Sequence, residues 1–68
     1  MKEYNGDIIV YEWPGWYLRD DIATGCRDPE DGQAFSLFRL EPYGREVVYA
    51  GTLAWAIREC TERIRLYY

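Results

Sequence analysis

Two segments rich in β-branched and aromatic residues lie near the start of the chain, separated by a turn signal. They are residues 7–13 and 16–20, with Pro14-Gly15 between them. Proline presets φ at the first central position of a turn, and glycine permits a positive φ at the second, which suits a tight type II turn. Residues 7–20 are therefore predicted to form a β-hairpin.

A second pair of strands follows the same logic. Apolar side chains return over residues 34–41, and residues 45–50 also have the composition of a strand. Between them, Glu41-Pro42-Tyr43-Gly44 fits a turn with proline at the second position and glycine at the fourth. We expect a second hairpin here, and hence an antiparallel sheet of about four strands.

One amphipathic helix is predicted at the carboxyl-terminal end of the chain, over residues 53–66. Thr52 precedes it and can accept a hydrogen bond from an early helix amide as the N-cap residue. Apolar residues recur at helical spacing, which places them on one face that can pack against the sheet. These residues are Leu53, Ile57, Cys60 and Ile64. The expected order of elements is ββββα, an α+β fold in a single domain over residues 1–68.

Residues 21–32 separate the two hairpins and contain few apolar side chains. Turn-forming residues dominate there, notably Thr24-Gly25 and the run from Asp28 to Gly32. A surface loop of about twelve residues is long for a compact domain, and long loops often carry function. We therefore treat this segment as a candidate functional region.

The charged residues are unevenly distributed. The chain has twelve acidic and eight basic residues, a net charge of −4, and no histidine. Residues 1–31 carry eight of the acids but only three bases, so the acidity is concentrated in the first hairpin and the loop after it. Such a surface repels nucleic acid and attracts basic protein surfaces. The alternative is a solvated loop that only keeps the protein in solution.

None of the familiar catalytic or metal-binding patterns is present. The run Asp28-x-Glu30-Asp31-Gly32 offers oxygen ligands but lacks the spacing of a calcium loop. Asp20 and Asp21 are adjacent, and adjacent strand residues point to opposite faces, which argues against a cooperating carboxylate pair. Cys26 has no histidine to activate it. We expect a protein that is not an enzyme and that has no metal and no cofactor.

Aromatic residues are the other unusual feature. Ten of the twelve aromatic residues are Tyr or Trp, which dominate protein-binding surfaces, although they can also cover the open face of a sheet. Trp55 lies about 200° around the helix from Leu53, so it points away from the start of the apolar stripe. It is expected to contact either a neighbouring segment or a partner.

The cysteines and the amino terminus indicate a compartment. No apolar run is long enough for a secretory signal or a membrane span, which needs roughly 20 residues. Cys26 and Cys60 are therefore expected to be reduced, Cys60 in the core and Cys26 in the loop, with a single disulfide as the alternative. We expect a soluble protein of the cytoplasm, or of the host cytoplasm if a phage encodes it.

Part of the sequence resembles HicB-type antitoxins, which bind a small toxin. The resemblance lies in Gly15-Trp16-Tyr17-Leu18, in Gly25-Cys26 and in the helix start Gly51-Thr52-Leu53-Ala54-x-Ala56-Ile57. The second predicted hairpin is an insertion relative to that family. The resemblance implies a regulatory module that binds a protein.

In size, acidity and expected architecture the chain is also similar to the anti-CRISPR proteins of phages and mobile elements. Several of those proteins present carboxylates in place of DNA phosphates. The similarity implies a stoichiometric inhibitor that occupies a basic groove, for example on a subunit of a CRISPR surveillance complex, with no direct nucleic-acid or membrane contact. The residues expected to bind the partner are Asp20, Asp21, Asp28, Glu30, Asp31 and Trp55.

Overall fold

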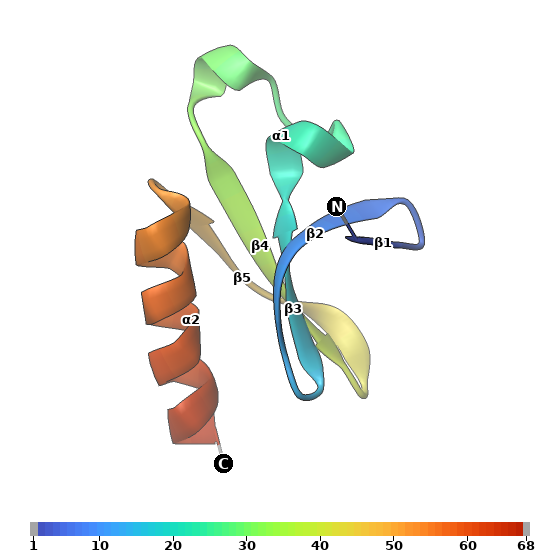
Figure 1. The fold of residues 1–68 in the computed structure, drawn as a ribbon, viewed down its shortest axis with the longest axis vertical. Coiled ribbons are helices and arrows are strands. Elements are labelled where there is room, and N and C mark those ends of the chain that lie inside the picture. Colours follow the sequence, from blue (N-terminus) through green and yellow to red (C-terminus); the bar gives the residue numbers. More distant parts are fainter. Residues whose placement is uncertain (1, 68) are drawn as a thin grey trace.

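The computed structural model describes residues 2–67, which form an antiparallel sheet followed by a carboxyl-terminal helix (Figure 1). Five strands pair in sequence order, β1 to β5. The strands are β1 (Lys2–Tyr4), β2 (Asp7–Trp13), β3 (Trp16–Asp20), β4 (Ala34–Leu40) and β5 (Tyr43–Ala50). The helical segments are α1 (Asp21–Thr24), the 3₁₀ turn η1 (Pro29–Asp31) and α2 (Leu53–Tyr67). The predicted α+β class is confirmed, with one more strand than expected.

The additional strand is β1. Tyr4 pairs with Asp7, and the two residues between them, Asn5 and Gly6, both have positive φ. An Asn-Gly pair is the strongest short hairpin signal because both residues tolerate that conformation. The signal was present in the sequence, and the prediction overlooked it.

The two predicted hairpins form, with one shift. Trp13 pairs with Trp16 across the Pro14-Gly15 turn, as expected. In the second hairpin Leu40 pairs with Tyr43, so the turn is centred on Glu41 and Pro42 and β5 begins two residues earlier than predicted. The Tyr43 ring stacks on Phe38 of β4, with ring centroids 5.6 Å apart, which holds Tyr43 in the strand.

Helix α2 begins where the sequence predicted. The Thr52 hydroxyl accepts a hydrogen bond from the Trp55 amide at 3.2 Å, which confirms the N-cap. The residues that α2 buries most deeply are Ala56, Cys60 and Ile64. Leu53 and Ile57, which were predicted to lie in the buried stripe, are only partly buried. Ala56 is buried more deeply than its neighbour Ile57, so the buried face of α2 is centred nearer to Ala56 than predicted.

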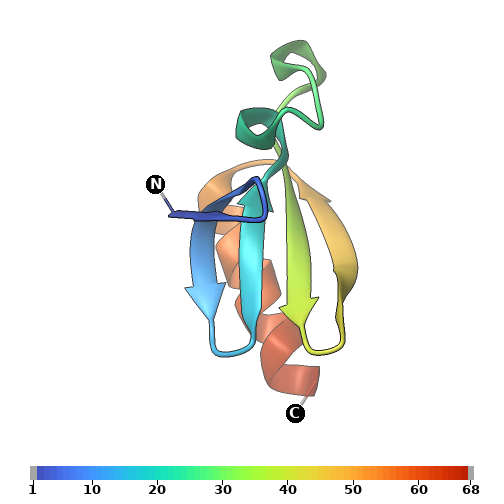
Figure 2. The same cartoon turned by 90° about the vertical axis from the view of Figure 1, so that its right-hand side faces the viewer.

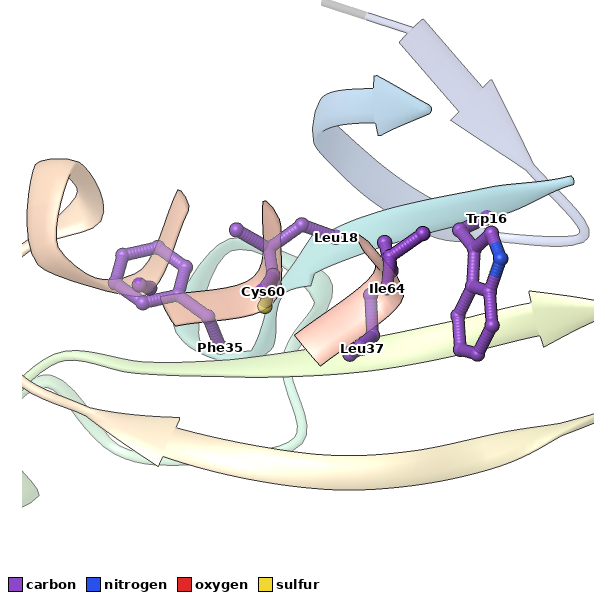
Figure 3. Close-up of a cluster of buried hydrophobic side chains, with 7 residues drawn as sticks. Trp16, Leu18, Phe35, Leu37, Cys60 and Ile64 are labelled. Carbon is purple, nitrogen blue, oxygen red and sulfur yellow. The ribbon is translucent and has the colours of Figure 1, made fainter. Parts of the chain in front are cut away.

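The main core lies between α2 and one face of the sheet. Side chains from β3 and β4 point toward the helix and meet its buried residues (Figure 3). The sheet contributes Trp16, Leu18, Phe35 and Leu37. Their spacing of two follows from the alternation of side chains along a strand.

The opposite face of the sheet is covered in a different way. Figures 1 and 2 show β1 and the start of β2 folded across it, on the side away from α2. Ile9, Tyr17 and Phe38 form a second, smaller buried cluster there. Of the described helices, none is long and apolar enough to cross a membrane.

Candidate functional site

The segment between β3 and β4 forms a projection that we call the acidic lobe, residues 20–32. It rises beyond the ends of the two strands and lies at the opposite end of the molecule from the β2–β3 and β4–β5 turns (Figure 2). The predicted surface loop contains two short helical segments that were not predicted from the sequence, α1 and η1. Asp28, Glu30 and Asp31 are exposed in the lobe, and within residues 2–67 none of their side chains forms an ion pair or hydrogen bond.

Asp20 has a structural role at the base of the lobe. Its carboxylate accepts hydrogen bonds from the amides of Ile22 and Ala23, at 3.0 and 3.1 Å, and so caps α1. Gly25 ends the helix in the left-handed conformation, with φ of 93°. The short helix is therefore fixed at both ends, and Asp20 is only partly available to a partner.

Asp21 does not lie on the surface, contrary to the expected position. Only 4% of the residue is exposed. One carboxylate oxygen accepts a hydrogen bond from Arg19 Nε at 2.8 Å, and the other accepts one from the Ser36 hydroxyl at 2.8 Å. Because both oxygens are used inside the protein, Asp21 anchors the lobe to β3 and β4. It is not part of the exposed acidic surface.

Asp21 belongs to a polar network that sequence reasoning missed. Arg19 also contacts the buried Asp7, with 3.3 Å between Nη1 and Oδ1, and its guanidinium lies 4.8 Å from the centre of the Phe38 ring. Burial lowers the pKa of Arg19, but the hydrogen bond with Asp21 and the surrounding negative charges outweigh it, so the pKa lies above its ordinary value. The arginine therefore stays charged between two carboxylates.

Two tyrosines extend this network toward the surface. The Tyr17 hydroxyl donates to Asp7 at 2.7 Å, and it lies 2.7 Å from the hydroxyl of Tyr43. Since the single Tyr17 proton is used on Asp7, Tyr43 is the donor to Tyr17. Burial, and then the hydrogen bonds with Tyr43 and Asp7, raise the pKa of Tyr17 far above its ordinary value. Tyr17 is therefore a neutral structural group.

The signal for this network in the sequence was weak. Tyr17 and Arg19 lie two apart on one strand, so they share a face, but their common partner Asp7 lies ten and twelve positions away along the chain. Only the register, in which Ile9 pairs with Arg19, brings Asp7 into reach. The alternation of side chains alone does not fix that register.

Around the network the sheet face carries exposed aromatic residues. Tyr4 of β1 contacts the ring of Tyr17, with 5.8 Å between ring centroids, and that of Tyr43. Tyr43 is 51% exposed, and Leu40 and Val48 are also exposed on this face of the two last strands. The high Tyr content of the sequence is thus explained in part, because tyrosine side chains cover this face of the sheet.

Trp55 has a neighbour within the chain. Its ring meets that of Tyr49 edge to face, with 5.4 Å between centroids, and it remains 37% exposed. Of the two alternatives from the sequence, the contact with a neighbouring segment is present, and the expected partner contact of Trp55 stays a prediction. Burial raises the pKa of Tyr49, and the positive charge of Arg63 partly opposes this.

Both cysteines are free, so the disulfide alternative is wrong. Cys60 is fully buried against the sheet, and burial raises the pKa of its thiol to about 12. Cys26 is exposed in the acidic lobe.

The described part of the chain has no pocket and no group of three or more side chains suited to bind a metal ion. A comparison with known proteins found no matching family model, no similar curated protein and no similar solved structure.

Proposed function

We propose that this chain is a non-catalytic protein of the cytoplasm that binds the basic surface of a partner protein through its acidic lobe. The observation that carries the proposal is the exposure of Asp28, Glu30 and Asp31, which have no internal ion pairs among residues 2–67. A carboxylate without an internal partner is available to a cation from outside. Asp20 and Asp21 fix α1 at the base of the lobe, and the Asp31 amide donates a hydrogen bond to the Asp28 carbonyl within the turn that carries the exposed acids.

The form of activity that best fits such a module is stoichiometric inhibition. A small acidic protein that occupies a groove used for nucleic acid excludes the phosphates from it. The resemblance to anti-CRISPR proteins favours a groove on a nucleic-acid-handling complex of the host cell. An antitoxin that binds a small basic toxin is the alternative, and the identity of the captured partner decides between them.

Affinity capture with three matched baits tests the proposal. They are the natural chain, a lobe variant (Asp28→Asn, Glu30→Gln, Asp31→Asn) and a control with three acids removed elsewhere (Glu3→Gln, Glu41→Gln, Glu62→Gln). Both variants lose the same charge. We expect a partner that the natural chain and the control retain and that the lobe variant loses. A partner held equally by all three baits would refute the role of the lobe.

Association and dissociation rates measured with that partner then separate the contribution of the lobe charges from that of Trp55. Removal of the lobe charges should mainly slow association, with a difference that shrinks as salt is added. Trp55→Ala should instead speed dissociation and depend little on salt. A labelled oligonucleotide should not bind the chain at physiological salt. Binding at micromolar concentration, lost at higher salt, would contradict the proposal.

A further inference from the structure

The outer edge of β5 is an unpaired strand edge. β5 has eight residues and pairs with β4 along its inner edge, while among residues 2–67 no strand pairs with its outer edge. The register with β4 shifts once, between Leu37 and Phe38, and is regular from Val47 to Ala50. Strand edges are commonly protected by proline, by lysine or by a covering segment. Residues 47–50 contain no proline and no lysine.

The side chains along this edge offer apolar surface on both faces of the sheet. Val48, which pairs with Ser36, is 39% exposed on the face away from α2. Tyr49 lies on the face covered by α2, where its ring and the half-exposed Trp55 form an edge-to-face pair. A strand added to β5 would cover Val48 with one set of alternate side chains and the Tyr49–Trp55 pair with the other.

The acidic lobe lies past the end of the same strand. The Gly51 amide donates a hydrogen bond to the carbonyl of Gln33 at 3.3 Å, which ties the segment after η1 to the end of β5. A strand antiparallel to β5 begins at the Ala50 end. If it extends two or three residues further, at about 3.3 Å per residue, its first residues come beside η1. The exposed Glu30 and Asp31 would then face the start of that strand.

We propose that the outer edge of β5 binds an extended segment of the partner protein as a sixth, antiparallel strand, with Lys or Arg at its amino-terminal end contacting Glu30 and Asp31. This inference rests on the proposed function and specifies how the partner is held. Backbone hydrogen bonds supply the affinity, and the two carboxylates select a basic start. A second copy of the chain is a poorer occupant, because both chains carry a net charge of −4.

A library of displayed nine-residue peptides, selected against the immobilised chain, tests this directly. Enriched peptides should carry Lys or Arg within their first three residues and no proline in their centre. When bound, they should slow the amide hydrogen exchange of residues 47–50. N-methylation of alternate peptide residues should weaken binding at least tenfold for one alternate set and leave the other nearly unchanged, because only one set of amides faces β5.

The charge contacts are tested with matched variants of the protein. Glu30→Gln with Asp31→Asn should weaken an enriched peptide about threefold to tenfold, whereas Glu3→Gln with Glu41→Gln should leave its affinity unchanged. The absence of enriched peptides, a bound peptide that protects no β5 amide, or a dimer that protects β5 by itself would overturn the proposal.

Failure of the β5 edge proposal can be distinguished from failure of the proposed function, which the capture experiment tests. If the lobe variant loses its partner but no peptide pairs with β5, the edge inference fails and the proposed function remains. If peptides add to β5 while all three baits retain the same partners, the edge binds extended chains but the proposed role of the lobe fails.

Discussion

The two faces of the sheet are stabilised by different kinds of contact. Toward α2, Leu18 and Leu37 pack with helix residues in an apolar cluster. On the other face, the guanidinium of Arg19 lies over the ring of Phe38, which stacks on Tyr17, and it is shared between Asp7 and Asp21. On the helix face, stability comes from buried apolar area, so the loss of stability on substitution grows with the area removed. The polar face depends on complete pairing, because a buried charge that loses its partner is costly.

The largest effect is expected from breaking the polar network. Arg19→Met leaves two carboxylates buried without a cation and should lower the free energy of unfolding by about 3–5 kcal/mol, measured by urea denaturation. Arg39→Met is the matched control, since the Arg39–Glu46 pair is more exposed, with 21% and 24% of the side chains accessible. If both variants lowered the free energy of unfolding by the same amount, the polar face would not depend on complete charge pairing more than the helix face does.

Apolar truncation should have similar effects on both faces. Leu37 and Phe38 are neighbours on β4 that point to opposite faces, and both are buried. Leu37→Ala and Phe38→Ala should each cost about 2–5 kcal/mol in the same denaturation experiment. Ile57→Ala should cost less than either, because Ile57 is only partly buried. If Ile57→Ala lowered the free energy of unfolding as much as Leu37→Ala, Ile57 would have to be buried, and α2 would be rotated about its axis relative to this structure.

The pH dependence of stability should distinguish the faces in the alkaline range. The Cys60 thiol has its pKa raised from 9.0 to about 12, so it stays neutral in the folded chain while the unfolded chain ionises. The unfolded state then binds fewer protons, and stability falls as pH rises from about 9 toward 12.

Cys60→Ala should flatten this decline between pH 8 and 10, measured as denaturation midpoints. Tyr17→Phe, on the opposite face, is the control. The pKa of Tyr17 is raised from 10.0, so its contribution is lost only at higher pH. If Cys60→Ala declines as steeply as the natural chain between pH 8 and 10, the thiol is not the group responsible.

The smallest effect is expected in the acidic lobe. Replacement of Asp28, Glu30 and Asp31 by their amides should change stability by less than about 0.5 kcal/mol per site, since these groups contact solvent. Asp20→Ala, in the same lobe, should cost about 1 kcal/mol because it removes the cap of α1. Thermal melts of the three single amide variants and of Asp20→Ala would show this order, and a single amide variant that lost more stability than Asp20→Ala would mean that the exposed acids are structural.

Local chemistry in the sequence was sufficient for most of the elements. Pro14-Gly15 set the β2–β3 hairpin, Thr52 set the start of α2, and the alternation around Phe35 and Leu37 set β4, which packs against α2. These features act between residues close in the chain, so they can be predicted without the fold. The Asn5-Gly6 turn was equally local and equally predictable.

The roles of the acidic residues were decided by the tertiary structure. In the sequence, Asp20, Asp21 and Asp28 are alike: carboxylates in a polar segment after a strand. In the fold, the first caps a helix, the second is buried between Arg19 and Ser36, and the third faces solvent. Strand pairing brings Ser36 to Asp21 across fifteen residues, and no local pattern encodes such a contact. Composition determined that the chain is acidic, whereas the register of the sheet determined which acids remain available to a partner.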